Sequence, residues 1–188
     1  AGFEQYSENT VICNIKKMLG LKEDLDYNLE ENLSTLRYGN VLMCVDADDD
    51  GMHILAHVIN FFREKFPGII KKNMLGYLRI PMIKVFKKNK IHKRFFAVKE
   101  FNNWKDKNDM KGMVTKYYKG LGTSTDDDIK DDLTTAPTVI CFYDSQSDEN
   151  LNLAFNKDLA DERKKWIEKW RDVAQVEDVV SMDVSNFG

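Results

Sequence analysis

Four carboxylates fall within five residues of one short segment, Asp46-Ala47-Asp48-Asp49-Asp50-Gly51. Carboxylates this close repel one another unless protons or a cation neutralise them. Their oxygens are the ligands that Mg²⁺ and Ca²⁺ prefer. The segment, called here the acidic turn, therefore predicts a divalent-metal site. The simpler alternative is a solvated turn in which Asp49 and Asp50 help to cap the following helix.

The spacing Asp-x-Asp-x-Asp-Gly also opens the calcium loop of an EF-hand. Such a loop needs a bidentate Glu at position 12, where this chain has His57. It also needs a preceding helix, whereas Val41–Val45 is a short apolar run typical of a buried strand. These two mismatches argue against an EF-hand. A strand, an acidic turn and an amphipathic helix instead predict an α/β arrangement, in which sites lie at the carboxyl ends of strands.

Apolar periodicity predicts the elements that position the acidic turn. Helices are expected over 9–19, 53–66 and 99–107, from a capped start at Thr125, and as one long helix over 151–171. Strands are expected over 41–45, 77–86 with an interruption at Pro81, 94–98, 113–118 and 138–143, with a hairpin turn at Asn89-Lys90.

Composition limits the class of protein. The chain has 188 residues, 43% of them hydrophobic, and a net charge of −3, which is ordinary for a globular protein. No apolar run approaches the roughly 20 residues needed to span a membrane, and the start shows no signal-peptide pattern. Widely spaced Cys13, Cys44 and Cys141 indicate reduced core cysteines of an intracellular protein. A basic stretch over 63–119, which includes Lys84, is compatible with a face for phosphates.

Six ordered segments resemble one known family over residues 9–171. They are Ser34–Gly39, Asp46–Ile54, Ile80–Val85, Lys116–Ser124, Leu153–Lys157 and Ala160–Trp166. Together they resemble the toprim region of a type IIA DNA topoisomerase of the eukaryotic, large-DNA-virus or phage kind. The resemblance implies an α/β fold, namely a toprim (Rossmann-like), mostly parallel sheet with helices on both faces, plus a C-terminal helical extension.

The same resemblance implies domain limits. Residues 1–40 would be an N-terminal helix and connection within a truncated toprim domain. Residues 41–148 would be the toprim domain itself. Residues 149–188 would be a helical extension that leads toward a winged-helix region.

The resemblance also implies roles for individual residues. Asp46, Asp48 and Asp50 would bind Mg²⁺, for which Mn²⁺ or Ca²⁺ can substitute in binding, and would act in catalysis through the metal. The DNA-binding candidates are Lys119, Gly120, Gly122, Arg37 and His53. Tyr117 and Tyr118 lie in a strand motif and are not expected to be the catalytic nucleophile.

The complete enzyme of this kind is an isomerase that passes one DNA double strand through another, as a homodimer that hydrolyses ATP. We expect ATP to bind only in the complete enzyme, and the upstream Glu motif, the ATPase region and the winged-helix tyrosine to lie outside this chain. The isolated chain is then expected to be inactive. Its expected partners are double-stranded DNA and the remaining topoisomerase regions, with no membrane partner. Its expected location is the nucleus or the cytoplasm. The alternatives are a toprim nuclease or primase, and a non-catalytic split subunit or scaffold of a DNA-processing complex.

Overall fold

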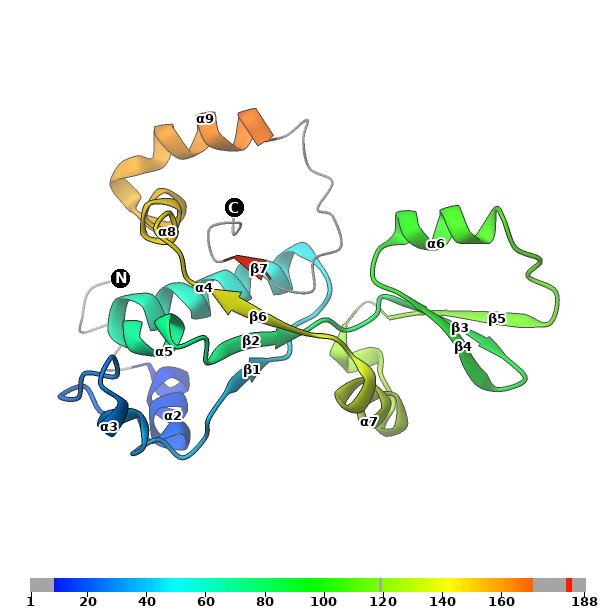
Figure 1. Cartoon of the computed structure of the whole chain (residues 1–188). Helices are drawn as coiled ribbons and strands as arrows, with labels where there is room; N and C mark the ends of the chain where they lie inside the picture. The colour runs from blue at the N-terminus through cyan, green and yellow to red at the C-terminus, as the bar shows by residue number, and fades with distance from the viewer. Residues whose placement is uncertain (1–8, 119, 171–181, 184–188) are drawn as a thin grey trace.

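The computed structural model of the chain describes residues 9–118, 120–170 and 182–183 (Figure 1). Its helices are α2 (Thr10–Leu19), α3 (Glu30–Leu33), α4 (Asp49–Lys65), α5 (Pro67–Lys71), α6 (Val98–Lys105), α7 (Asp126–Thr135), α8 (Ser147–Phe155) and α9 (Ala160–Trp170). Its strands are β1 (Val41–Met43), β2 (Leu75–Leu78), β3 (Ile83–Lys87), β4 (Lys90–Phe95), β5 (Met113–Tyr117), β6 (Thr138–Phe142) and β7 (Met182–Asp183). No helix in the described part is both long and apolar enough to cross a membrane.

The mixed α/β character is confirmed, but the expectation of a mostly parallel, Rossmann-like sheet is not confirmed, although the β1–β2 and β6–β7 pairs are parallel. The central sheet has the order β1-β2-β6-β7, and its middle pair, β2–β6, is antiparallel. The second sheet has the order β4-β3-β5 and is antiparallel throughout. Parallel pairing needs a long crossover. The α4–α5 segment supplies one between β1 and β2, whereas β3 and β4 are joined by a tight hairpin.

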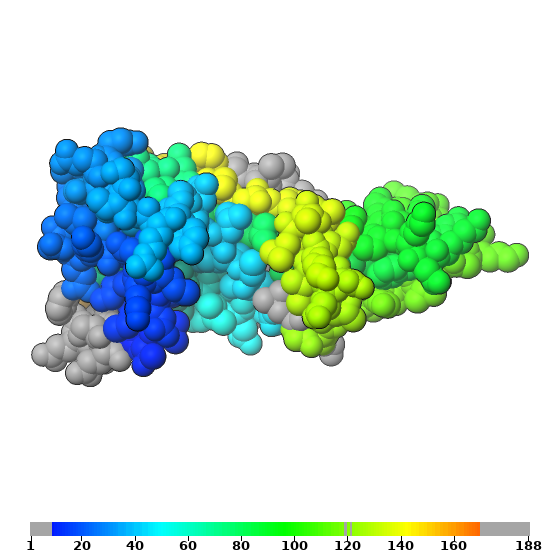
Figure 2. All heavy atoms as spheres, turned by 90° about the horizontal axis from the view of Figure 1, so that it is seen from below, coloured from blue at the N-terminus to red at the C-terminus, as the bar shows by residue number. Residues whose placement is uncertain are grey.

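The second sheet and α6 form an arm, defined here as residues 83–117, that extends from one end of the molecule. Figure 1 and Figure 2 both show this arm projecting away from the central sheet, with α7 between the two. The arm has its own small core of four buried residues, Ile83, Val85, Phe95 and Phe101. A separate, larger core packs α4 and α5 against β2 and β6.

The apolar run 77–86 divides at Pro81, as its sequence predicts, and its two parts enter different sheets. β2 ends at Leu78 in the central sheet, and β3 begins at Ile83 in the arm. Proline lacks the N–H that a sheet ladder requires and so favours a break between strands. The arm therefore leaves the central sheet at the end of β2.

The expected long helix over 151–171 is wrong, because the chain breaks at Asn156. The side chain of Asn156 accepts a hydrogen bond from the Asp158 backbone N–H, which starts a short 3₁₀ turn over Lys157–Leu159. Arg163 Nη1 donates to the carbonyl oxygens of Leu153 (3.0 Å) and Ala154 (2.6 Å) at the end of α8. These carbonyls lack partners within the helix, so Arg163 supplies from α9 the hydrogen bonds that a continuous helix would have provided.

Candidate functional site

The acidic turn joins β1 to α4, and its last three carboxylates lie at the start of that helix. Asp48 is the N-cap, and its Oδ1 accepts a hydrogen bond of 2.8 Å from the Gly51 backbone N–H. Asp49 and Asp50 occupy the first turn, where negative charge favours the helix dipole. The helix therefore begins four residues before the predicted His53. The capping alternative named Asp49 and Asp50, whereas the side chain that caps the helix is that of Asp48. Capping does not exclude metal binding, since a carboxylate has further acceptor positions.

Two glycines allow close packing around Asp46. A Cβ on Gly51 would collide with the Asp46 backbone oxygen. A Cβ on Gly120 would lie only 2.5 Å from Asp46 Oδ2 and 2.9 Å from its Cγ. The segment after β5 therefore reaches the acidic turn, and two motifs that are far apart in the sequence meet at one carboxylate.

A cavity of about 200 Å³ opens beside this contact. The residues that line it include Asp46, Asp48, Asp49, Arg79 and Phe96. The guanidinium carbon of Arg79 lies 4.8 Å from the centroid of the Phe96 ring, a favourable cation–π contact. Two carboxylates of the predicted site and one arginine thus share a single hollow.

Sequence reasoning missed Arg79, although a signal for it exists. Arg79 directly follows β2, and Asp46 follows the neighbouring parallel strand β1. Because the carboxyl ends of parallel strands meet at one edge of a sheet, correct pairing of these two strands would have placed both residues at the same cavity.

The remaining predicted residues do not converge on this cavity. Asp50 and His53 are exposed and do not line it, and His53 instead contacts His57 one helical turn further on. Arg37 lies before β1, at the end opposite to Asp46, where it lines a separate hollow. Gly122 is exposed, with open space where a Cβ would lie. Lys119 lies outside the described residues.

The side chains at the cavity suit a Mg²⁺ ion that is bound through few protein ligands. In the described ranges no three His, Cys, Asp or Glu side chains are grouped closely enough to hold a metal ion, so a cage made only of these side chains is not present. Mg²⁺ usually binds through one or two carboxylates, with waters and substrate phosphates completing its shell. Asp46 and Asp48 meet that requirement.

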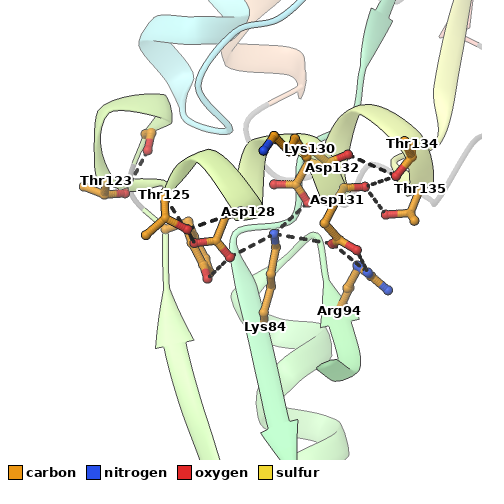
Figure 3. Close-up of polar contacts among 12 residues, drawn as sticks. Lys84, Arg94, Thr123, Thr125, Asp128, Lys130, Asp131, Asp132, Thr134 and Thr135 are labelled. Carbon is orange, nitrogen blue, oxygen red and sulfur yellow. Dashed lines mark hydrogen bonds and ion pairs between the residues drawn. The ribbon is translucent and has the colours of Figure 1, made fainter. Parts of the chain in front are cut away.

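A buried ion-pair cluster fixes α7 to the arm (Figure 3). Lys84 on β3 is fully buried, and its Nζ lies 2.7 Å from Asp132, 3.7 Å from Asp128 and 3.8 Å from Asp131 on α7. Arg94 Nη2 donates to both carboxylate oxygens of Asp131, at 2.8 and 2.7 Å. We call these five residues the Lys84 cluster. Lys84 therefore does not belong to a basic surface for phosphates, because its charge is directed into this cluster.

The pKa values of Asp128 and Asp132 are shifted in opposite directions. Burial acts to raise the pKa of Asp128, but hydrogen bonds from Thr125 and Tyr118, together with the charge of Lys84, leave that pKa below its ordinary value. Burial raises the pKa of Asp132, and Lys84 opposes this shift only in part. Removing charge from water is costly unless partners replace its solvation, and Asp128 has more such partners.

The Lys84 cluster also holds the start of the loop that reaches Asp46. The hydroxyl of buried Tyr118 donates a hydrogen bond of 2.9 Å to Asp128 Oδ1. Thr125 and Asp128 form a reciprocal capping box that starts α7. Gly120 lies between these two anchors, so the cluster positions the backbone that packs on the Asp46 carboxylate.

Comparison with known proteins gives consistent matches. The family model described as the C-terminal associated domain of TOPRIM matches residues 78–187. Human DNA topoisomerase 2-alpha is 36% identical over 171 residues, covering 89% of this chain and 11% of the relative. DNA topoisomerase 2-beta of Mus musculus is also 36% identical, over 89% of this chain and 10% of the relative. The chain thus spans about a tenth of the length of these curated relatives.

One solved structure aligns over the whole chain. It is the crystal structure of the DNA-binding, cleavage and re-ligation domain of Plasmodium falciparum topoisomerase II. The TM-score is 0.84 at 28% sequence identity, and the alignment covers 100% of this chain and 26% of that one.

Proposed function

Since the chain belongs to the family of C-terminal associated domains of TOPRIM and corresponds to the toprim region of a type IIA DNA topoisomerase, we propose that it forms part of the DNA cleavage and re-ligation core of such an enzyme. Within this core it binds Mg²⁺ at Asp46 and Asp48. The observation that carries this proposal is that Asp46, Asp48 and Arg79 line one cavity, while the Gly120 backbone packs on the Asp46 carboxylate. Asp50 remains a predicted ligand that lies outside the cavity lining.

Each side chain has a defined task in this proposal. Asp46 and Asp48 present carboxylate oxygens to the metal, while Asp48 also keeps α4 capped. When bound, Mg²⁺ supplies stabilisation for charge that develops on a phosphate and on the leaving 3′ oxygen. Arg79 offers a planar guanidinium suited to a phosphate of the DNA backbone. Lys119 and the glycine backbone beside Asp46 add a second contact to the same phosphate chain.

The chain contributes one part of the complete reaction. We propose that strand scission also needs a Glu-containing metal motif and a winged-helix tyrosine supplied by other regions of the enzyme, and that ATP acts only there. Double-stranded DNA and a second copy of the complete enzyme are the proposed partners. The matches to DNA topoisomerases over 89% of this chain favour this function over a toprim nuclease, a primase or a scaffold.

The substitution Asp48→Asn tests the metal assignment, because asparagine caps a helix about as well as aspartate but lacks the charge. We expect the fold to persist and the affinity for Mg²⁺ to fall by roughly tenfold or more. The measurement is Mg²⁺-dependent binding of a labelled DNA duplex by fluorescence anisotropy. Asp127→Asn is the matched control, because Asp127 is a highly exposed aspartate in the first turn of α7 and does not line the cavity. Equal Mg²⁺ dependence in the two variants would contradict the proposal.

A further inference from the structure

Two histidines meet on the exposed face of α4, away from the cavity. His53 and His57 are one helical turn apart, and their Nε2 atoms lie 3.0 Å from each other. The ring centroids are 4.4 Å apart, and the ring planes are inclined by 80°. Both residues are exposed, and neither lines the cavity of the acidic turn. The pair is therefore accessible from solvent and separate from the proposed Mg²⁺ ligands.

The separation of the two nitrogens matches the spacing of two ligands on one metal ion. Zn²⁺ binds histidine nitrogen at about 2.0–2.1 Å, which places two such nitrogens roughly 2.8–3.4 Å apart for angles at the metal between about 90° and about 109°. The observed 3.0 Å lies within this range. The two histidines are also four residues apart on one helix face, which is the spacing that helical zinc motifs use to bind their metal.

The surroundings favour the neutral imidazole that a metal requires. The ring of His57 packs against Phe155 of α8, with centroids 4.9 Å apart. Partial burial lowers the pKa of His57, and the charge of His53 lowers it further. Phe155 also restricts the rotation of the His57 ring, so part of the ordering cost of binding is already met in the free protein.

We propose that His53 and His57 form a two-histidine site for a late first-row divalent ion such as Zn²⁺ or Cu²⁺. No third side chain of the ligating types is grouped with the pair among the described residues, so water completes the metal's shell and the ion exchanges readily. Imidazole selects such ions, whereas carboxylate oxygens suit Mg²⁺. The chain then has two sites of different selectivity, one in the turn before α4 and one on the exposed face of that helix, and this inference does not depend on the proposed function.

A Zn²⁺ titration of the 188-residue chain in excess Mg²⁺ tests the site, because Mg²⁺ competes for carboxylates and not for imidazoles. We expect one Zn²⁺ per chain, with shifts of both Nε2 resonances in long-range ¹H–¹⁵N NMR spectra. His53→Ala and His57→Ala should each weaken binding by roughly tenfold or more. His92→Ala is the matched control, because it removes the third histidine of the chain, which lies in the arm beside Trp104.

The competing interpretation is a simple N–H···N hydrogen bond between the two rings. In that case His53→Ala and His57→Ala would bind Zn²⁺ as His92→Ala does, and Zn²⁺ would leave both Nε2 resonances unshifted. Either result overturns the proposal.

Discussion

At the scale of single residues, the site depends on the absence of a side chain at position 120. The Gly120 backbone packs directly on the Asp46 carboxylate, and a Cβ there would lie 2.5 Å from Oδ2. Gly122, two residues later, has nothing within 4 Å of the same hypothetical atom. Gly122 is not among the described glycines with a positive φ, so alanine is compatible with its backbone. Substitutions at the two positions therefore distinguish loss of the contact with Asp46 from a change in loop flexibility.

We predict that Gly120→Ala displaces the Asp46 carboxylate and lowers the affinity for Mg²⁺ by roughly tenfold. Stability should change by less than about 1 kcal/mol, because the side-chain end of Asp46 can move and alanine reduces the entropy of the unfolded chain. Gly122→Ala should leave Mg²⁺ binding unchanged. Calorimetric Mg²⁺ titrations and urea unfolding of both variants provide the measurement. An unaltered Mg²⁺ affinity in Gly120→Ala would separate Asp46 from metal binding.

At the scale of elements, the α8–α9 corner depends on one guanidinium. Arg163 Nη1 contacts three carbonyl oxygens near the end of α8, those of Leu153, Ala154 and Asn156. The Leu153 and Ala154 carbonyls are among the groups that a helix end leaves without partners. Lys164, the next residue, only forms an exposed pair with Asp161 at 3.1 Å. Adjacent positions on one helix thus have very different structural roles.

We predict that Arg163→Ala lowers the free energy of unfolding by about 1–3 kcal/mol, the usual range for charged hydrogen bonds that leave a partner unsatisfied. Lys164→Ala should change it by less than about 0.5 kcal/mol, because exposed ion pairs contribute little. Urea unfolding followed by far-UV circular dichroism measures both values. Similar losses in the two variants would show that the corner does not rely on Arg163.

Elements with local signals were predictable from the sequence. Helix α2 ends at Gly20, which adopts the left-handed conformation with φ 78° that its position predicts. Helix α7 begins at Thr125 with a complete capping box. Each signal lies within a few residues of the element it limits, and tertiary packing does not override it.

Features that depend on distant residues were not predictable in the same way. The burial of Lys84 depends on carboxylates of α7, more than forty positions later in the sequence. The break after α8 depends on Arg163. The presence of Arg79 beside Asp46 depends on the pairing of β1 with β2. Periodicity gives the type of an element but not its neighbour, so the contribution of Arg79 to the candidate cavity was missed.

At the scale of the whole molecule, the arm is a separately packed unit joined to the rest near α7. Its core does not share buried residues with the central core. The Lys84 cluster lies on the arm side of α7, and Tyr118 continues from it to the loop at Asp46. Lys84 therefore couples the arm to the candidate site, through α7 and through the Gly120 backbone.

We predict that Lys84→Met lowers stability by about 3–5 kcal/mol near pH 7, because it leaves buried carboxylates without their cation. The loss should shrink as the pH falls toward about 4. In the unaltered protein the lowered pKa of Asp128 provides stability that disappears on acidification. In the variant the carboxyls lack Lys84, so their folded-state pKa values rise and acidification favours the fold. Lys87→Met, at the exposed end of the same strand, is the control.

Hydrogen exchange distinguishes loss of coupling from general destabilisation. In Lys84→Met we expect amides of β3, β4 and β5 to exchange faster than those of β1 and β2, because the arm can open without unfolding the central core. The contact between Gly120 and Asp46 should loosen when the arm opens. The affinity for Mg²⁺ therefore falls, although Lys84 does not line the cavity. Uniform acceleration of exchange in both sheets, or a stability loss that does not depend on pH, would show that the cluster does not act as the joint between arm and site.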